Sequence, residues 1–270
     1  MASNGASGMS GPIAVSLHDI TVRFGRLTAL DSVAFDVPAG QHRAIIGPNG
    51  AGKSTLFGVV AGTHRPTSGR VIVDGDDITS LPVHRRADVG VITTFQHSSL
   101  FLRETVLENV LLAVARKARV AHRWFRPATA YREQLERSAE LLAQVGLAGR
   151  EALPAGALSH GERRQLEVGV ALAAEPRVLL LDEPAAGMSP AETARLSELI
   201  RGLPAEMTVL LVEHDLDLVF DLAHEVTVLH LGQLLTTGSV AQVRANEDVQ
   251  RAYLGAADVD ELFFDREETR

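Results

Sequence analysis

The sequence predicts an α/β fold built around a mixed, largely parallel β-sheet. Short apolar runs that indicate buried strands alternate with stretches whose apolar residues recur at the period of a helix. A glycine-rich loop stands directly between one such strand and the helix that follows it. Apolar strands that alternate with helices are typical of a sheet covered by helices on both faces.

Length and composition indicate one large domain, or a core with a subdomain. The chain has 270 residues, of which 46% are hydrophobic and 22% are charged, as in ordinary soluble proteins. The absence of cysteine excludes disulfides, thiolate metal sites and thiol catalysis. A net charge of −8 argues against a general nucleic-acid binder, which needs a basic face. The sequence has neither a secretory signal nor an apolar run of the roughly 18 residues that a membrane span needs.

The amino-terminal part is expected to form strands that lead to the glycine loop. Residues 13–37 alternate apolar and polar over short spans, which is the period of β-strands. After a turn at 38–40, residues 42–46 are predicted to form a buried strand that leads into the loop, and a helix runs from Lys53 to about Gly62. Residues 1–12 are small, polar and glycine-rich, so they are predicted to be a disordered leader or a non-native extension.

Strands and helices then alternate through the rest of the chain. Residues 89–95 are expected to form a strand that leads to Gln96, and residues 104–146 to be helical with an arginine-rich interruption. Further helices are predicted at 160–174, 190–201 and 216–223, and further strands at 178–181 and 208–212. The predicted organisation is a catalytic core at 13–96 and 158–255, a helical subdomain at about 97–157, and an acidic tail at 256–270.

The glycine-rich loop has the composition of a phosphate-binding loop. Its glycines let backbone N–H groups face the phosphates, and the following helix adds the positive end of its dipole. Lys53 is predicted to reach the β and γ phosphates, and the Ser54 hydroxyl is predicted to bind Mg²⁺. A glycine-rich turn with a chance lysine is the alternative. The predicted ATP-binding residues of the loop are Gly47, Pro48, Asn49, Gly50, Ala51, Gly52, Lys53, Ser54 and Thr55.

A second motif lies between this loop and an apolar strand that ends in Asp182 and Glu183. It reads Leu-Ser-His-Gly-Glu over residues 158–162. In this order the motifs resemble those of the ATP-binding cassette (ABC) ATPases, over about residues 13–255. The resemblance implies a P-loop NTPase core with an N-terminal antiparallel β part and an inserted α-helical subdomain. It also implies ATP as the nucleotide and Mg²⁺ as the metal ion.

Two acids at the end of a strand are predicted to serve the hydrolysis of ATP. The strand at 178–181 brings the Asp182 carboxylate to the sheet edge beside the phosphate loop, where it suits Mg²⁺ coordination. Glu183 points differently and is the predicted general base for the attacking water. The alternative interpretation is that Asp182 and Glu183 have no catalytic role and stand at the solvated start of a helix, where acids are favoured.

The resemblance adds three residues to the predicted site. Gln96, after its strand, is expected to reach Mg²⁺ and the water, and His214, after the strand at 208–212, to donate a hydrogen bond to the γ-phosphate. Phe24 stands where related proteins place an aromatic ring against adenine. A phenylalanine in the core is the alternative for Phe24.

The second motif is expected to begin a helix with an anion site. Ser159 fits an N-cap, and Glu162 lies three residues on, as in a capping box. The Ser159 hydroxyl and the Gly161 N–H then form an anion site at the helix start, whereas His160 is at a variable position. In the resembling family this site faces the γ-phosphate bound by the opposite subunit, which implies a dimer. Ser189 stands where many relatives carry aspartate; it can still hydrogen-bond across that dimer, but it carries no charge.

Within the family, the chain looks most like the ATPases of branched-chain amino acid importers. The similarity lies in residues 183–193, an arginine-rich insertion at about 116–130, and the ending at 245–255. It implies membrane permease subunits as partners, a solute-binding protein as an indirect one, and a place at the cytoplasmic face of the membrane. The dimer partner is either a second copy or a second ABC ATPase. Urea or lipopolysaccharide-export ATPases, and a non-transport ABC ATPase, are the alternatives.

Overall fold

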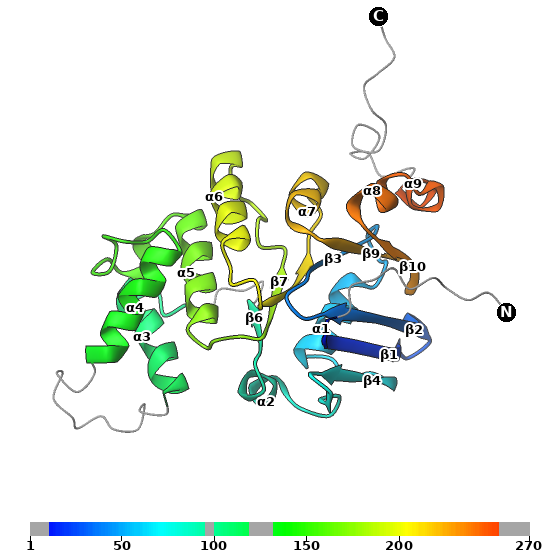
Figure 1. Ribbon diagram of the computed structural model, residues 1–270, viewed down its shortest axis with the longest axis horizontal. Coiled ribbons are helices and arrows are strands. Elements are labelled where there is room, and N and C mark those ends of the chain that lie inside the picture. Colours follow the sequence, from blue (N-terminus) through cyan, green and yellow to red (C-terminus); the bar gives the residue numbers. More distant parts are fainter. Residues whose placement is uncertain (1–10, 95–99, 119–131, 254–270) are drawn as a thin grey trace, which may run out of the picture.

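The computed structural model describes residues 11–94, 100–118 and 132–253, and two β-sheets organise this part of the chain (Figure 1). The first sheet has the strand order β2-β1-β4-β5 and is antiparallel throughout. The predicted N-terminal antiparallel part is therefore confirmed. Its strands are β1 (Ile13–Phe24), β2 (Leu27–Pro38), β4 (Ser68–Val73) and β5 (Asp76–Asp77).

The second sheet is mixed and largely parallel, as predicted. Its strand order is β10-β9-β3-β8-β7-β6, and only the pair at the β10 edge is antiparallel. The carboxyl ends of the five parallel strands consequently meet at one edge. The strands are β3 (His42–Ile46), β6 (Val91–Thr94), β7 (Val178–Asp182), β8 (Thr208–Val212), β9 (Glu225–His230) and β10 (Gln233–Gly238).

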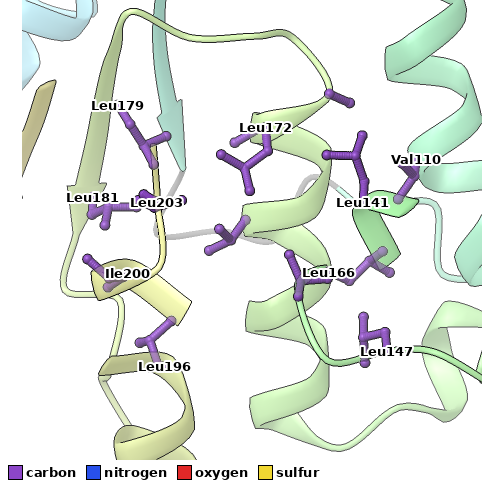
Figure 2. Close-up of a cluster of buried hydrophobic side chains, with 14 of the residues drawn as sticks. Val110, Leu141, Leu147, Leu166, Leu172, Leu179, Leu181, Leu196, Ile200 and Leu203 are labelled. Carbon is purple, nitrogen blue, oxygen red and sulfur yellow. The ribbon is translucent and has the colours of Figure 1, made fainter. Parts of the chain in front are cut away.

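Both faces of this central sheet are buried. Successive side chains of a strand point to opposite faces, so β7 contributes to two separate cores. Leu179 and Leu181 pack against helices α5 (His160–Leu172) and α6 (Pro190–Arg201), as Figure 2 shows. Val178 and Leu180 pack on the other face, towards the antiparallel sheet. Burial on both faces explains why β7 and β8 are continuous apolar runs rather than alternating ones.

The helices flank the central sheet, and those of the predicted helical subdomain lie together beyond its β6 edge (Figure 1). Helices α3 and α4 bury apolar residues in the same cluster as α5, α6 and one sheet face. No helix in the described ranges is both long and apolar enough to cross a membrane. The helices are α1 (Lys53–Ala61), α2 (Val83–Asp88), α3 (Val106–Lys117), α4 (Arg132–Gln144), α5 (His160–Leu172), α6 (Pro190–Arg201), α7 (Leu216–Leu222), α8 (Val240–Arg244) and α9 (Glu247–Tyr253).

The strand predicted at 89–95 begins too early. Val89 instead closes helix α2, where its N–H donates to the carbonyl of Arg86 at 3.2 Å. Gly90 follows with φ +88°, a left-handed turn that a strand does not contain, and β6 starts at Val91. The β-branched residues of this stretch extend across the turn, so composition alone does not locate the strand's first residue.

Arg86 fixes the helix that follows the phosphate loop. Its side chain is buried, and its guanidinium donates to the carbonyls of Val59 at 2.5 Å and Val60 at 2.6 Å, at the last turn of α1. It also donates to the carbonyl of Leu81 at 2.9 Å. A cation at a helix C-terminus is favourable because the last carbonyls carry the negative end of the dipole. This contact anchors the end of α1 opposite the phosphate loop.

Candidate nucleotide site

The phosphate loop joins β3 to α1, and two of its glycines are required by their surroundings. Gly47 has φ +151°, and a Cβ added there would lie 2.2 Å from the carbonyl oxygen of Leu229. Gly52 has φ +102°, and its Cβ would lie 2.7 Å from Cδ2 of Leu30. Other residues would be strained and would clash at both positions. The loop backbone therefore wraps tightly before the helix begins.

Lys53, the first residue of α1, is held inside this loop. Its side chain is buried, and Nζ donates to the carbonyl oxygens of Gly47 at 2.6 Å and Pro48 at 3.1 Å. Burial lowers the pKa of Lys53, while the nearby charge of Glu183 opposes this shift. The ammonium group thus lies among the loop carbonyls and within electrostatic reach of Glu183. Ser54 follows at the exposed helix start.

One cavity of about 560 Å³ brings together most of the predicted ATP-site residues. Loop residues 49–55 line it together with Phe24, Glu183 and His214, which come from three other regions of the sequence. Phe24 is 52% exposed, so the alternative of a core phenylalanine is wrong. The ring contacts His64 edge-on, with the two centroids 5.9 Å apart.

Two apolar residues that the sequence did not single out line the same cavity. Leu27 is 65% exposed and Leu231 is 78% exposed. A single exposed leucine is common, but these two lie with the exposed Phe24 at one cavity. Leu27 begins β2 directly after the turn that follows Phe24, and Leu231 has φ +49° in the turn before β10. The sequence feature that could have identified both leucines is a large apolar residue within or next to an otherwise polar turn. With Phe24 they form an apolar rim suited to a flat base.

Asp182 is the last residue of β7 and carries a buried, unpaired oxygen. Its Oδ1 has no hydrogen-bond partner among the described residues. Burial, followed by the charge of Glu183, raises the pKa of Asp182 to about 6. A buried carboxylate oxygen with a free lone pair is suited to a hard cation such as Mg²⁺, so this residue fits the metal that the resemblance implies. The exposed Ser54 hydroxyl offers a second oxygen of the same kind.

Glu183 and His214 face each other across the ends of β7 and β8. His214 Nε2 and Glu183 Oε1 are 2.7 Å apart. The N–H of Glu183 donates to the carbonyl of Val212 at 2.8 Å, and its φ of +45° turns the chain away from the strand direction. Glu183 lines the cavity, and Asp182 is not among the residues that line it. The buried Glu213, which the sequence analysis did not single out, lies between these two loops.

The predicted capping box of the second motif is confirmed. Ser159 caps α5: its Oγ accepts from the N–H of Glu162 at 3.2 Å, and its own N–H donates to the Glu162 carboxylate at 2.9 Å. The N–H of Gly161 donates to Oε1 of Glu192 at 3.2 Å, in helix α6. His160 Nε2 lies 3.1 Å from the carbonyl of Ala186. These motif residues do not line the cavity, so the start of α5 is a surface separate from it.

Ser189 has a role within its own chain. It is the N-cap of α6, and its Oγ accepts from the N–H of Glu192 at 3.4 Å and donates to Oε2 of Glu192 at 2.8 Å. Several predicted residues lie outside the described ranges. They are Gln96, residues 1–10 of the predicted leader, the part of the arginine-rich insertion from residue 119 onward, and the acidic tail at 256–270.

Three features together define a nucleotide-binding ATPase cassette. They are the strand–glycine loop–helix unit, the Asp-Glu pair at the end of a neighbouring strand, and the capped helix α5 that begins at the second motif. The family model described as ABC transporter matches residues 30–186, more than half of the chain. The chain belongs to the ABC transporter family and is an ATPase of that class. A second model, described as Branched-chain amino acid ATP-binding cassette transporter, matches residues 233–259.

Relatives and solved structures agree with this family over nearly the whole chain. The high-affinity branched-chain amino acid transport ATP-binding protein BraF of Pseudomonas aeruginosa is 41% identical over 256 residues, covering 92% of this chain and all of BraF. The protein of the same description named LivG, of Escherichia coli, is 38% identical over 258 residues with the same coverage. The ADP conformation of MJ1267, an ATP-binding cassette of an ABC transporter, is 30% identical with a TM-score of 0.79. That match covers 90% of this chain and 99% of MJ1267.

Proposed function

We propose that this chain is the ATP-hydrolysing subunit of an importer for branched-chain amino acids or a similar small polar solute. The observation that carries the proposal is the single cavity lined by Phe24, the phosphate loop, Glu183 and His214. BraF and LivG support the class of solute, because the similarity runs through the whole cassette and into its carboxyl end. These relatives do not favour the alternatives of a urea or lipopolysaccharide-export ATPase or a non-transport ABC ATPase.

Each polar group of the site has one task in the proposed hydrolysis. Lys53 holds the β and γ phosphates, and the apolar rim around Phe24 holds the adenine. Ser54 and Asp182, with Gln96, would hold Mg²⁺, which neutralises phosphate charge when it is bound. Glu183 takes a proton from the attacking water, because its carboxylate lies in the cavity beside the phosphate loop.

His214 has a separate task beside Glu183. Its Nε2 is within hydrogen-bond distance of the Glu183 carboxylate and at the wall of the same cavity. When ATP is bound, its N–H exchanges the Glu183 carboxylate for an oxygen of the γ-phosphate and stabilises the transition state. The roles of Glu183 and His214 are therefore those of a base and an electrostatic stabiliser.

The second anion surface supports a dimer. The start of α5, with Ser159, Gly161 and Glu162, lies outside the cavity of its own chain, so it serves a nucleotide held by another subunit. Gly161 must exchange its hydrogen bond to Glu192 for one to that phosphate. The other subunit is a second copy of this chain or a second ABC ATPase. In either case ATP closes the dimer because each nucleotide touches both subunits.

A transport ATPase of this kind works through separate membrane permease subunits at the cytoplasmic face of the membrane. A solute-binding protein takes part indirectly, by delivering the solute to the permease, and nucleic acid has no role.

A basic group would face the permease or the lipid headgroups. It is formed by Arg116, Lys117, Arg119, Arg123 and Arg126. A solvated loop is the alternative. Replacing all five with glutamine should reduce assembly with the permease, and normal assembly and transport would refute this docking role.

Uptake into vesicles tests the function directly. The chain is reconstituted with permease subunits and a solute-binding protein from the same organism, and uptake of labelled leucine, isoleucine and valine is measured with ATP inside the vesicles. A Lys53→Ala variant provides the control, since it removes the cation that holds the phosphates. ATP-dependent uptake of another solute alone would reject the branched-chain assignment. Lack of any ATP-dependent transport would reject the transport function.

A further inference from the structure

Glu213 is a buried acid to which the proposed hydrolysis assigns no task. It follows the last residue of β8 and is 5% exposed. The N–H of Ala185 donates to its Oε1 at 2.8 Å, and the N–H of His214 donates to its Oε2 at 3.0 Å. One carboxylate therefore ties the loop after β7 to the loop after β8. A buried carboxylate that accepts two backbone N–H groups is a strong anchor, because charge-assisted hydrogen bonds exceed neutral ones in strength.

The first of these loops contains a strained residue. Glu183 has φ +45°, in the left-handed region that costs a residue with a side chain roughly 1–2 kcal/mol. Such a conformation persists only where surrounding contacts hold it. One contact is the hydrogen bond from the N–H of Glu183 to the carbonyl of Val212 at 2.8 Å. The hydrogen bond from Ala185 to Glu213, two residues further on, is the second.

The same carboxylate also holds the partner of Glu183. The backbone of His214 is anchored on Oε2 of Glu213, and the ring of His214 lies 2.7 Å from the carboxylate of Glu183. Both sides of this contact thus depend on one side chain. The phosphate loop is fixed by other contacts, since Lys53 binds the carbonyls of Gly47 and Pro48.

We propose that Glu213 is a positioning residue for ATP hydrolysis, which holds the Glu183 turn and the His214 backbone at the distance that the reaction needs. The inference rests on the proposed function of Glu183 as general base. The proposed role predicts different effects on ATP turnover and on ATP binding. Loss of the Glu213 carboxylate should misplace Glu183 and His214, which slows turnover, but it should leave the phosphate loop and therefore ATP binding intact. A misplacement of about 1 Å at a reacting group costs on the order of 100-fold in rate.

Glu213→Gln tests this in the assembled transporter. Glutamine keeps the volume and one accepting oxygen, but its NH₂ group faces the second backbone N–H, so one anchor is lost. The expected result is a fall in kcat of roughly 10-fold to 100-fold, with KM for ATP within about threefold of the wild-type value. Glu225→Gln is the matched control. Glu225 is the first residue of β9, and its carboxylate pairs with the buried Arg43 of β3. Its loss should lower the stability of the fold while kcat stays normal.

Ala185→Pro is the second variant, and it leaves Glu213 in place. Proline has no N–H, so this change removes the donor on the Glu183 loop. We expect a loss of kcat of the same order, and the double variant should lose less than the product of the two single losses, because both changes loosen loops that the same Glu213 carboxylate anchors. Thermal unfolding and Mg-ATP binding establish whether each variant is folded. If Glu213→Gln does not fold, Ala185→Pro tests the same inference.

Three outcomes are decisive. Normal kcat in Glu213→Gln would overturn the positioning role. A loss of ATP affinity as large as the loss of kcat would also overturn it, because the residue would then serve the site as a whole. A wild-type transporter that hydrolyses no ATP would instead remove the proposed function, which distinguishes that failure from failure of this inference.

Discussion

His214 Nε2 lies 2.7 Å from Glu183 Oε1, although the two residues are separated by 31 positions in the sequence. The contact forms because β7 and β8 are parallel neighbours, with Asp182 opposite Val212, so their carboxyl ends carry both residues to one edge. The two groups assigned to proton transfer and phosphate binding therefore share one hydrogen bond. A change to either one should alter turnover before it alters nucleotide binding.

Glu183→Gln should stop turnover and preserve binding. The amide keeps the shape of the side chain and its reach to His214, but it does not take up a proton, so hydrolysis should fall by about 100-fold or more. Lys53 and the phosphate loop are unchanged, and removing a negative charge near the γ-phosphate should favour the ATP-bound dimer. Phosphate release measures the first effect. Light scattering with and without Mg-ATP measures the second.

The partner requirement is tested with the same variant. If this chain pairs with a different ATPase, the dimer should accumulate only when that protein is added. Hydrolysis at the normal rate in Glu183→Gln would remove Glu183 from the mechanism.

Phe24→Ala should weaken ATP binding. The ring is 52% exposed and lines the cavity beside the phosphate loop. If it stacks on adenine as proposed, its loss should cost roughly 1–3 kcal/mol, the contribution of base–aromatic stacking. Isothermal titration with Mg-ATP measures the change. Phe101→Ala is the matched control, since Phe101 is 59% exposed and does not line the cavity. Equal ATP affinities in the two variants would mean that Phe24 does not hold the base.

Asp182 should make the protein without nucleotide or Mg²⁺ less stable as pH rises. Its pKa is raised to about 6 in the folded chain, above the value of about 3.9 in unfolded chains. The folded state therefore binds the proton of the Asp182 carboxyl more tightly than the unfolded state does. Ionisation of Asp182 does not lower the free energy of unfolding below about pH 4, lowers it progressively between about pH 4 and 6, and has its full effect above that range.

Asp182→Asn removes this dependence. After allowance for solvent screening, the variant should gain about 1–2 kcal/mol over the wild type near pH 7.5, and no comparable gain near pH 4. Thermal unfolding at both pH values, without Mg²⁺, measures the difference. An equal difference at the two pH values would contradict the assignment to Asp182.

Arg86→Met should destabilise the fold. The guanidinium satisfies the carbonyls of Val59 and Val60 at the buried end of α1, and unsatisfied buried carbonyls cost about 1–3 kcal/mol each. We expect a loss of roughly 3 kcal/mol or more in denaturant unfolding. Arg85→Met, at an exposed position in the same helix, should change stability by less than about 1 kcal/mol. A similar small effect at Arg86 would show that the contact does not stabilise α1.

Local rules were enough for much of the chain and of the candidate site. The strand at Thr208–Val212 and the helix at Pro190–Arg201 were predicted at their observed bounds, because an apolar run and an amphipathic period are properties of consecutive residues. The glycine loop and the Ser159–Glu162 capping box were predictable for the same reason, since each depends on residues a few positions apart. The strand start at residue 89 was wrong where a glycine turn interrupted the apolar run.

Tertiary structure alone decided which distant residues meet. The order of strands in the central sheet brings Glu183 to His214 and places the carboxylate of Glu213 between their loops. Neither strand order nor the burial of one acid among many follows from local spacing, because both depend on how whole elements pack. The sequence by itself therefore determined the phosphate loop, the acids and the family they indicate. The packing of β7 beside β8 decided the geometry in which those acids stand.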